Sequence, residues 1–156
     1  MTRVLIATDG SSVSRVATRY AADVLGTLNL DGICVLTVVR PPMEPLMDAD
    51  SILIPQDTWR ALEAAAQDAA SMALQAAMAD LARFDGLLKT VSRTGHHVPR
   101  VIVDTACELG ANLIVMGASR HGTLRTLLGG DVSDWVQRHA HCPVLLVRPN
   151  QPCAPL

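Results

Sequence analysis

Two short segments carry the residue types that could bind a ligand. The first is Thr8-Asp9-Gly10-Ser11, and the second runs from Met116 through Gly122 and continues to Ser133. A glycine-rich loop that leads into a helix presents free N–H groups and the positive end of the helix dipole, which suits a phosphate group. Glycines also serve plain turns, so the residues alone leave a phosphate site and an ordinary loop as alternatives.

Residues for catalysis do not form a recognisable pattern. The sequence has neither a Gly-x-Ser-x-Gly elbow nor a Walker lysine, and His96-His97 has no acid at a useful spacing. Ser11 and its neighbours faintly resemble the pyrophosphate loop of ATP pyrophosphatases, but that loop needs more glycines. We therefore expect no catalytic residue and no enzymatic activity.

Metal-ligating residues gather at one place, His139-Ala-His141-Cys142. The four cysteines are far apart in the sequence and form no Cys-x-x-Cys pair, which argues against a zinc site. A cationic end to a helix explains the histidines more simply. We expect no metal site.

The elements that would position these residues alternate strictly between strand and helix. Strands are expected at 3–8, 33–39, 87–94, 113–116 and 144–147, and helices at 12–28, 58–83, 99–109 and 132–139. This alternation predicts an α/β fold, a five-stranded parallel sheet with helices on both faces. In such sheets, ligands bind beyond the carboxyl ends of the strands, where both polar segments are expected.

Apolar periodicity supports the first two helices. In the first, apolar residues recur every four positions, at Val16, Tyr20, Val24 and Leu28. In the second, which Thr58 could cap, they lie along one face at Leu62, Ala66, Ala70, Leu74, Met78 and Leu81. Between them, residues 40–57 hold four prolines and no periodicity, which predicts a long exposed loop that could bind a protein partner.

Composition limits the class of protein. A chain of 156 residues suits one domain, expected over residues 1–150 with a frayed tail at 151–156. The net charge of −2 gives no basic face for nucleic acid. No apolar run approaches the ~20 residues that would span a membrane. The N-terminal run is too short for a signal peptide, so we expect a cytoplasmic protein.

Four segments together resemble the universal stress protein family. They are VLIATDGSSVS, LTVVRP, ANLIVMGASRHGTLRTLLGGDVSDWV and HAHCPVLLVRP, which follow the family's order and spacing over about residues 3–149. The resemblance implies a Rossmann-like five-stranded fold, frequent dimerisation and a role in bacterial stress responses. The short apolar strand at Val144 to Val147 is the edge through which we expect a homodimer.

The same resemblance implies where an adenine nucleotide such as ATP would bind. Asp9 would approach the nucleotide and Val38 would lie behind the adenine. The remaining nucleotide-lining positions are Met116, Gly117, Gly130, Val132 and Ser133. Each has a plainer interpretation: Asp9 or Ser133 as a helix cap, and Val38 or Met116 as part of the core.

Two positions depart from the motif of the ATP-binding members, Gly-x2-Gly-x9-Gly-Ser/Thr. Gly117 and Gly130 match its first and third glycines, but Arg120 replaces the second glycine and Asp131 replaces the Ser or Thr. Both departures fall where the phosphates would lie, and Arg120 could pair with Asp131. We therefore expect a non-enzymatic stress-response protein whose ATP binding is weakened or lost. The alternative is an ATP-binding switch with slow hydrolysis that uses Arg120 for phosphate contact.

Overall fold

Nine helices and strands follow one another along the part of the chain that the structure, a computed structural model, describes: residues 2–26, 30–42, 55–118 and 132–149. They are β1 (Arg3–Ala7), α1 (Ser12–Leu25), β2 (Gly32–Val39), α2 (Gln56–Asp80), β3 (Leu87–Thr94), α3 (Val98–Glu108), β4 (Leu113–Gly117), α4 (Val132–His139) and β5 (Val144–Val147). The strands pair in parallel in the order β3-β2-β1-β4-β5. The predicted five-stranded parallel sheet is confirmed.

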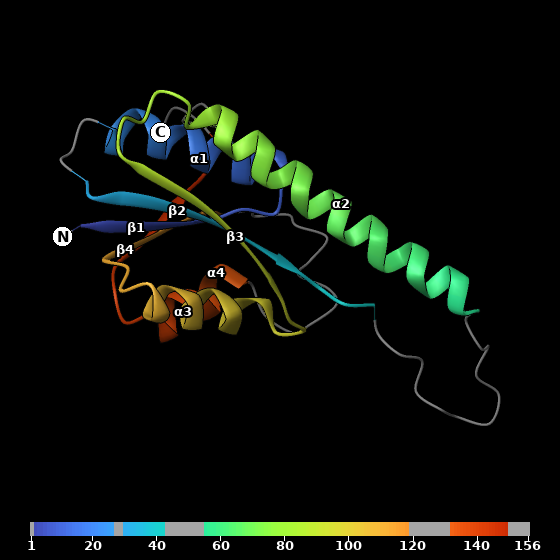
Figure 1. Ribbon diagram of the computed structural model, residues 1–156. Coiled ribbons are helices and arrows are strands. Elements are labelled where there is room, and N and C mark those ends of the chain that lie inside the picture. The colour runs from blue at the N-terminus through green and yellow to red at the C-terminus, as the bar shows by residue number, and fades with distance from the viewer. Residues whose placement is uncertain (1, 27–29, 43–54, 119–131, 150–156) are drawn as a thin grey trace, which may run out of the picture.

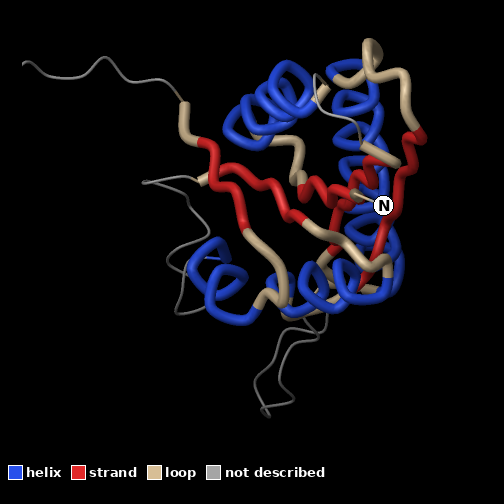
Figure 2. The backbone as a smooth tube through the Cα atoms, turned by 90° about the vertical axis from the view of Figure 1, so that its left-hand side faces the viewer, coloured by secondary structure: helices blue, strands red, loops and turns tan. Residues whose placement is uncertain are grey.

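The sheet lies between two pairs of helices, with α1 and α2 on one face and α3 and α4 on the other (Figures 1 and 2). Successive side chains of a strand point to opposite faces. Accordingly, Val4 and Ile6 of β1 pack with α1 and α2, whereas Leu5 and Ala7 pack on the side of α3 and α4. Both faces are apolar because both are covered, as is usual for a parallel sheet.

The buried face of α1 differs from the one its periodicity indicated. Tyr20 and Val24 are 44% and 41% exposed, while Ala17 and Ala21 are fully buried. The β-branched side chains of the sheet already fill the space between the layers, so α1 turns its smallest residues toward them. The periodicity predicted the helix correctly but not the face that it buries.

The helix α2 begins at Gln56 and extends past the carboxyl ends of the strands (Figure 1). The prediction that Thr58 caps it is wrong, because Thr58 lies inside the helix and Pro55 precedes it. Burial begins in its second half, at Ala70, and Leu62 is 47% exposed. Much of the predicted loop before α2, residues 43–54, lies outside the described residues.

An acidic side chain joins α1 to α2. The Asp80 carboxylate accepts hydrogen bonds from Arg15 at 3.2 Å and from Arg19 at 3.0 Å, and its side chain is only 9% exposed. Burial acts to raise the pKa of Asp80, but the hydrogen bonds and charges of the two arginines outweigh it and lower the pKa. The pair of helices is therefore linked by a carboxylate that is charged at neutral pH.

Aromatic rings join α3 to α4 on the opposite face. The Trp135 ring stacks on His139 at a centroid distance of 3.9 Å and meets His97 edge-on at 5.0 Å. His97 also caps α3, since its Nδ1 accepts a hydrogen bond from the Arg100 N–H. Within the described residues, no helix combines the length and apolarity needed to cross a membrane.

Candidate functional site

The loop between β1 and α1 is held in a tight turn. Gly10 has a φ of 77°, a conformation that favours glycine, and a Cβ added there would lie 3.0 Å from the Cβ of Ala73 on α2. The Ser11 N–H donates to Oδ1 of Asp9 at 3.0 Å. This Asx turn places the Asp9 carboxyl at the carboxyl edge of the sheet.

Ser11, and not Asp9, caps α1. The Ser11 hydroxyl accepts a hydrogen bond from the Ser14 N–H at 3.2 Å, and the buried Ser14 hydroxyl accepts one from Thr8 at 3.1 Å. The interpretation of Asp9 as the helix cap is therefore wrong. Its carboxylate instead stabilises the turn and keeps acceptor capacity for a ligand.

The Asp9 carboxylate is held in its charged form. Burial acts to raise its pKa, but hydrogen bonds from Ser11 and Ser14 outweigh that effect and lower the pKa below its ordinary value. At neutral pH, Asp9 is an anionic acceptor. Such a group suits hydroxyl or amine donors of a ligand and repels its phosphates.

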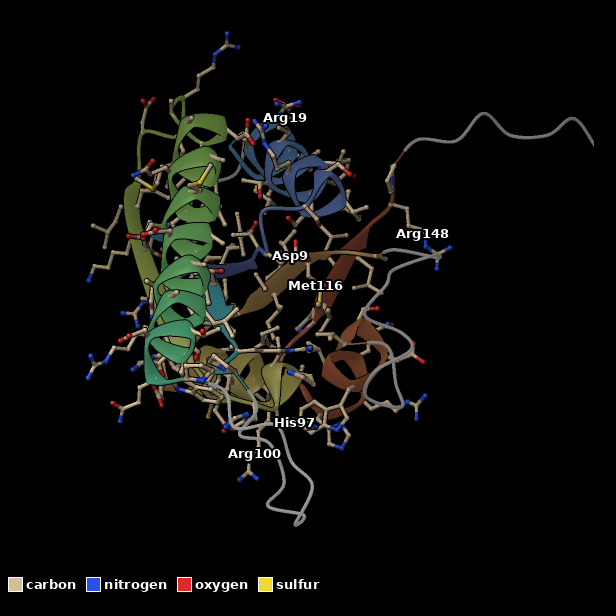
Figure 3. All side chains as sticks on the ribbon, turned by 90° about the vertical axis from the view of Figure 1, so that its right-hand side faces the viewer. Asp9, Arg19, His97, Arg100, Met116 and Arg148 are labelled. Atoms are coloured by element: carbon tan, nitrogen blue, oxygen red, sulfur yellow. The ribbon has the colours of Figure 1, made fainter. Side chains whose placement is uncertain are left out.

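A cavity of about 560 Å³ opens where β1, β2 and β4 end. That volume is in the range of small-molecule sites. Figure 3 looks onto this edge, with Asp9 and Met116 near the middle, between α1 above and α3 and α4 below. The predicted nucleotide residues that line the cavity are Asp9, Val38, Met116, Gly117, Val132 and Ser133.

The other three predicted residues, Arg120, Gly130 and Asp131, lie outside the described residues. Within the first turn of α4, Ser133 is the second residue and is 3% exposed, so it does not occupy the cap position that sequence reasoning left open. Val38 and Met116 belong to the core on the side of α3 and α4 and also line the cavity, so the two interpretations of these residues are compatible.

Gly117 has a structural reason to be glycine. An added Cβ would lie 2.9 Å from three atoms of Val13 in the first turn of α1, two of them in the backbone. Contacts this short are sterically forbidden, so the first glycine of the loop motif permits close packing of α1 on β4. Its presence does not by itself indicate a phosphate site.

The walls of the cavity include residues that sequence reasoning missed. Ala66, Ala69 and Ala70 of α2 form one side, and Arg40 lies where β2 ends. The alternation of side chains along β2 could have predicted Arg40 as a lining residue. Arg40 is two residues beyond Val38 and four beyond Leu36, and residues at this spacing share a face of the strand. Only the packing of α2 against the strand ends reveals the alanines.

The lining is mainly aliphatic, with hydroxyl groups near α1 and α4. Among the described residues that line it, Asp9 and Arg40 are the charged ones. The described part of the chain contains no cluster of three or more histidine, cysteine or acidic residues that could hold a metal ion. The lining is suited to a largely apolar small molecule that carries hydrogen-bond donors within reach of Asp9.

A parallel sheet with helices on both faces and a ligand-sized cavity at its carboxyl edge defines a doubly wound α/β protein. The model of the Universal stress protein family matches residues 1–148. The chain belongs to the universal stress protein family.

Known members of the family match this chain along most of its length. A universal stress protein of Methanocaldococcus jannaschii is 28% identical over 147 residues, which cover 94% of this chain and 81% of that protein. The solved structure of the universal stress protein UspA from Lactobacillus plantarum has a TM-score of 0.73 and 22% identity, covering 94% and 97% of the two chains. A universal stress protein solved in complex with cAMP has a TM-score of 0.66 and 24% identity, covering 94% and 96%.

Proposed function

We propose that this universal stress protein binds an adenine nucleotide of low phosphate charge in the cavity at the carboxyl edge of its sheet, without transforming it. The observation that carries the proposal is the convergence of six residues, predicted independently of the structure, on one cavity of about 560 Å³. The related structure in complex with cAMP shows that an adenine nucleotide binds to a protein of this fold.

ATP is disfavoured because of two residues of the glycine-rich loop, Arg120 and Asp131. A carboxylate about 4 Å from a phosphate charge costs ~4 kcal/mol at an effective dielectric constant near 20. That cost corresponds to roughly a thousandfold loss of affinity for each such charge. Asp9, which is also anionic, adds to the repulsion of a polyphosphate.

Calorimetric titration with ATP, AMP, cAMP and adenosine tests this ranking. We expect AMP or cAMP to bind more tightly than ATP. In the double variant Arg120→Gly/Asp131→Ser, ATP affinity should rise. The same changes at exposed positions outside the cavity lining, Arg83→Gly/Asp85→Ser, provide a matched control. Micromolar ATP binding by the unmodified protein would contradict the proposal, and loss of ATP binding in the double variant would favour the switch that uses Arg120.

Binding without catalysis is supported by the groups that line the cavity. Its described lining carries the Asp9 carboxylate and serine hydroxyls, but no histidine, cysteine or lysine that could pair with them as general base or nucleophile. We expect no phosphate release from ATP above the rate in buffer, measured over hours with stoichiometric protein. A release rate that follows protein concentration, and is lost in Asp9→Asn, would refute a purely binding role.

A homodimer through β5 is the second part of the proposal. This strand is at the edge of the sheet, and beside it a hollow is lined by Val16 and the half-exposed Tyr20 of α1. An apolar edge strand invites pairing with a second copy. Light scattering after size exclusion should give a dimer mass, and Tyr20→Glu should lower it. Leu62→Glu, which changes an apolar residue of similar exposure on α2, is the control.

A further inference from the structure

Two buried hydroxyl groups lie beside the Asp9 carboxylate, one at the end of a strand and one in a helix. Thr8, directly after β1, is 6% exposed, and Ser14, in the first turn of α1, is 5% exposed. The Thr8 hydroxyl donates to the Ser14 hydroxyl at 3.1 Å. Both residues line the cavity together with Asp9, and neither is among the predicted nucleotide residues.

Backbone hydrogen bonds fix both of these residues in place. The Thr8 N–H donates to the Leu36 carbonyl of β2 at 2.9 Å, which holds Thr8 at the edge of the sheet. The Ser14 N–H donates to the Ser11 hydroxyl at 3.2 Å, within the capped first turn of α1. The hydroxyls beside Asp9 therefore belong to two rigid elements rather than to a loop.

The hydrogen bonds of this cluster run in one direction, toward Asp9. The Gly10 N–H can only donate, and it donates to the Thr8 hydroxyl at 3.2 Å, which leaves the Thr8 proton for Ser14. The Ser14 hydroxyl in turn donates to the Asp9 carboxylate. Its other acceptor is the neutral Ser11 carbonyl at 3.0 Å, and a charged carboxylate is the stronger acceptor. Hydrogen bonds in such a chain polarise one another, so the Thr8 hydroxyl strengthens the bond that Ser14 makes to Asp9.

Within the described residues, hydrogen bonds rather than a cation keep the Asp9 carboxylate charged. Burial acts to raise its pKa, and the hydrogen bonds from Ser11 and Ser14 outweigh that effect. The described parts of α1, α2, α3, β4 and α4 that line the cavity carry no charged side chain, and Arg40 after β2 is the other charged residue of the described lining. The loop that contains Arg120 and the anionic Asp131 lies outside the described residues.

We propose that Thr8 and Ser14 are positioning residues, which hold the Asp9 carboxylate in place to accept a hydrogen bond from the ligand. This rests on the proposed function and deepens it, because it names the groups that prepare the acceptor. A carboxylate has about four lone-pair positions, and the donors of the α1 turn use only some of them. The others suit an N–H or O–H donor of the ligand, such as an amino group or a ribose hydroxyl.

Removing the Thr8 hydroxyl in proteins with and without the Asp9 carboxylate tests this role. In Thr8→Val, which keeps the shape of the side chain, AMP affinity in calorimetry should fall about 2- to 10-fold, the loss expected for one hydrogen bond. In the Asp9→Ala protein, the same change should leave AMP affinity constant, because Thr8 acts through Asp9. Thr8→Ser keeps the hydroxyl and should keep most of the affinity. Thr18→Val is the matched control, since it removes a buried hydroxyl that donates to the Ser14 carbonyl and lies outside the cavity lining.

The titration of Asp9 in the ligand-free protein, followed through the ¹³C signal of its carboxyl group, is the second measurement. The pKa of Asp9 should rise in Thr8→Val and in Ser14→Ala, because donors stabilise the charged form, and it should stay constant in Thr18→Val.

Two results would overturn the assignment. One is a constant pKa of Asp9 in both Thr8→Val and Ser14→Ala. The other is an equal loss of AMP affinity from Thr8→Val with and without the Asp9 carboxylate, which would show that Thr8 only supports the fold. If the unmodified protein binds neither AMP nor adenosine, the proposed function fails and the ligand role of Asp9 fails with it, while the titration still decides whether the two hydroxyls hold the carboxylate.

Discussion

Replacing Gly117 by alanine should destabilise the fold, whether or not a ligand is present. The new Cβ would lie 2.9 Å from the carbonyl carbon, the carbonyl oxygen and Cγ1 of Val13. Two of these atoms belong to the backbone of α1 and cannot move without shifting the helix on the sheet. Overpacking of this kind costs about 1–3 kcal/mol. For a chain of this size, that corresponds to a fall in melting temperature of roughly 2–12 °C.

Differential scanning calorimetry of Gly117→Ala, Val13→Ala and the double variant would measure the effect. Because Val13→Ala removes one of the three close contacts, the double variant should recover only a minor part of the loss, relative to Val13→Ala alone. Gly110→Ala gives a reference value for the cost of the backbone conformation alone. Gly110 has a φ of 60° and its added Cβ would have no neighbour closer than 3.7 Å, so only the backbone conformation is penalised, by about 1–2 kcal/mol.

A Gly117→Ala protein that melts within about 1 °C of the unmodified chain would refute the packing explanation. The glycine would then have to be explained by contact with a ligand. In that case nucleotide affinity, rather than stability, should fall in the variant. The two measurements together therefore separate a glycine kept for packing from one kept for binding.

Three further changes test the site and its supports. Asp80→Asn should lower the urea midpoint more at pH 7 than at pH 3. Burial acts to raise the pKa of Asp80, but its two arginine partners lower the pKa below its ordinary value, so its contribution is complete above about pH 4 and declines as the pH falls toward the folded pKa. Equal losses at both pH values would contradict this. Ser11→Ala should cost about 1 kcal/mol in urea unfolding because the cap of α1 is removed, whereas the exposed neighbour change Ser12→Ala should cost little. Ala70→Leu should fill the cavity and abolish AMP binding in calorimetry, and the exposed Ala79→Leu should not; retained binding in Ala70→Leu would place the ligand elsewhere.

Much of the fold was predictable from local signals. The bounds of β3, α4 and β5 agree with the expected residues, because glycine or proline residues lie close to their ends. The error in the face of α1 has a different origin. The predicted face followed the large residues spaced every four positions, such as Tyr20, but close contact between a helix and a sheet of branched side chains favours the smaller Ala17.

The site was predictable in part, from motifs rather than from physical pattern. Asp9 and Ser133 are far apart in the sequence; the predicted parallel sheet placed both of their segments at the carboxyl ends of the strands, and the resemblance to known proteins selected these residues within the segments. Arg40 was missed although it lies inside the segment LTVVRP, because it was assigned to the start of the exposed loop 40–57, whereas the structure places it in the cavity lining. The alanine wall of α2 could not be predicted, since nothing local indicates that this helix extends past the strand ends.

The ring contacts of Trp135 make its intrinsic fluorescence a probe of the region around α4. The chain has two tryptophans, and Trp59→Phe would leave Trp135 as the single indole. Its ring stacks on His139 within α4 at a centroid distance of 3.9 Å and meets His97, which caps α3, at 5.0 Å, so the emission of Trp135 should report how α4 lies against α3. Because the same helix α4 carries Ser133 into the cavity, a ligand that shifts this helix would change the emission without any added label.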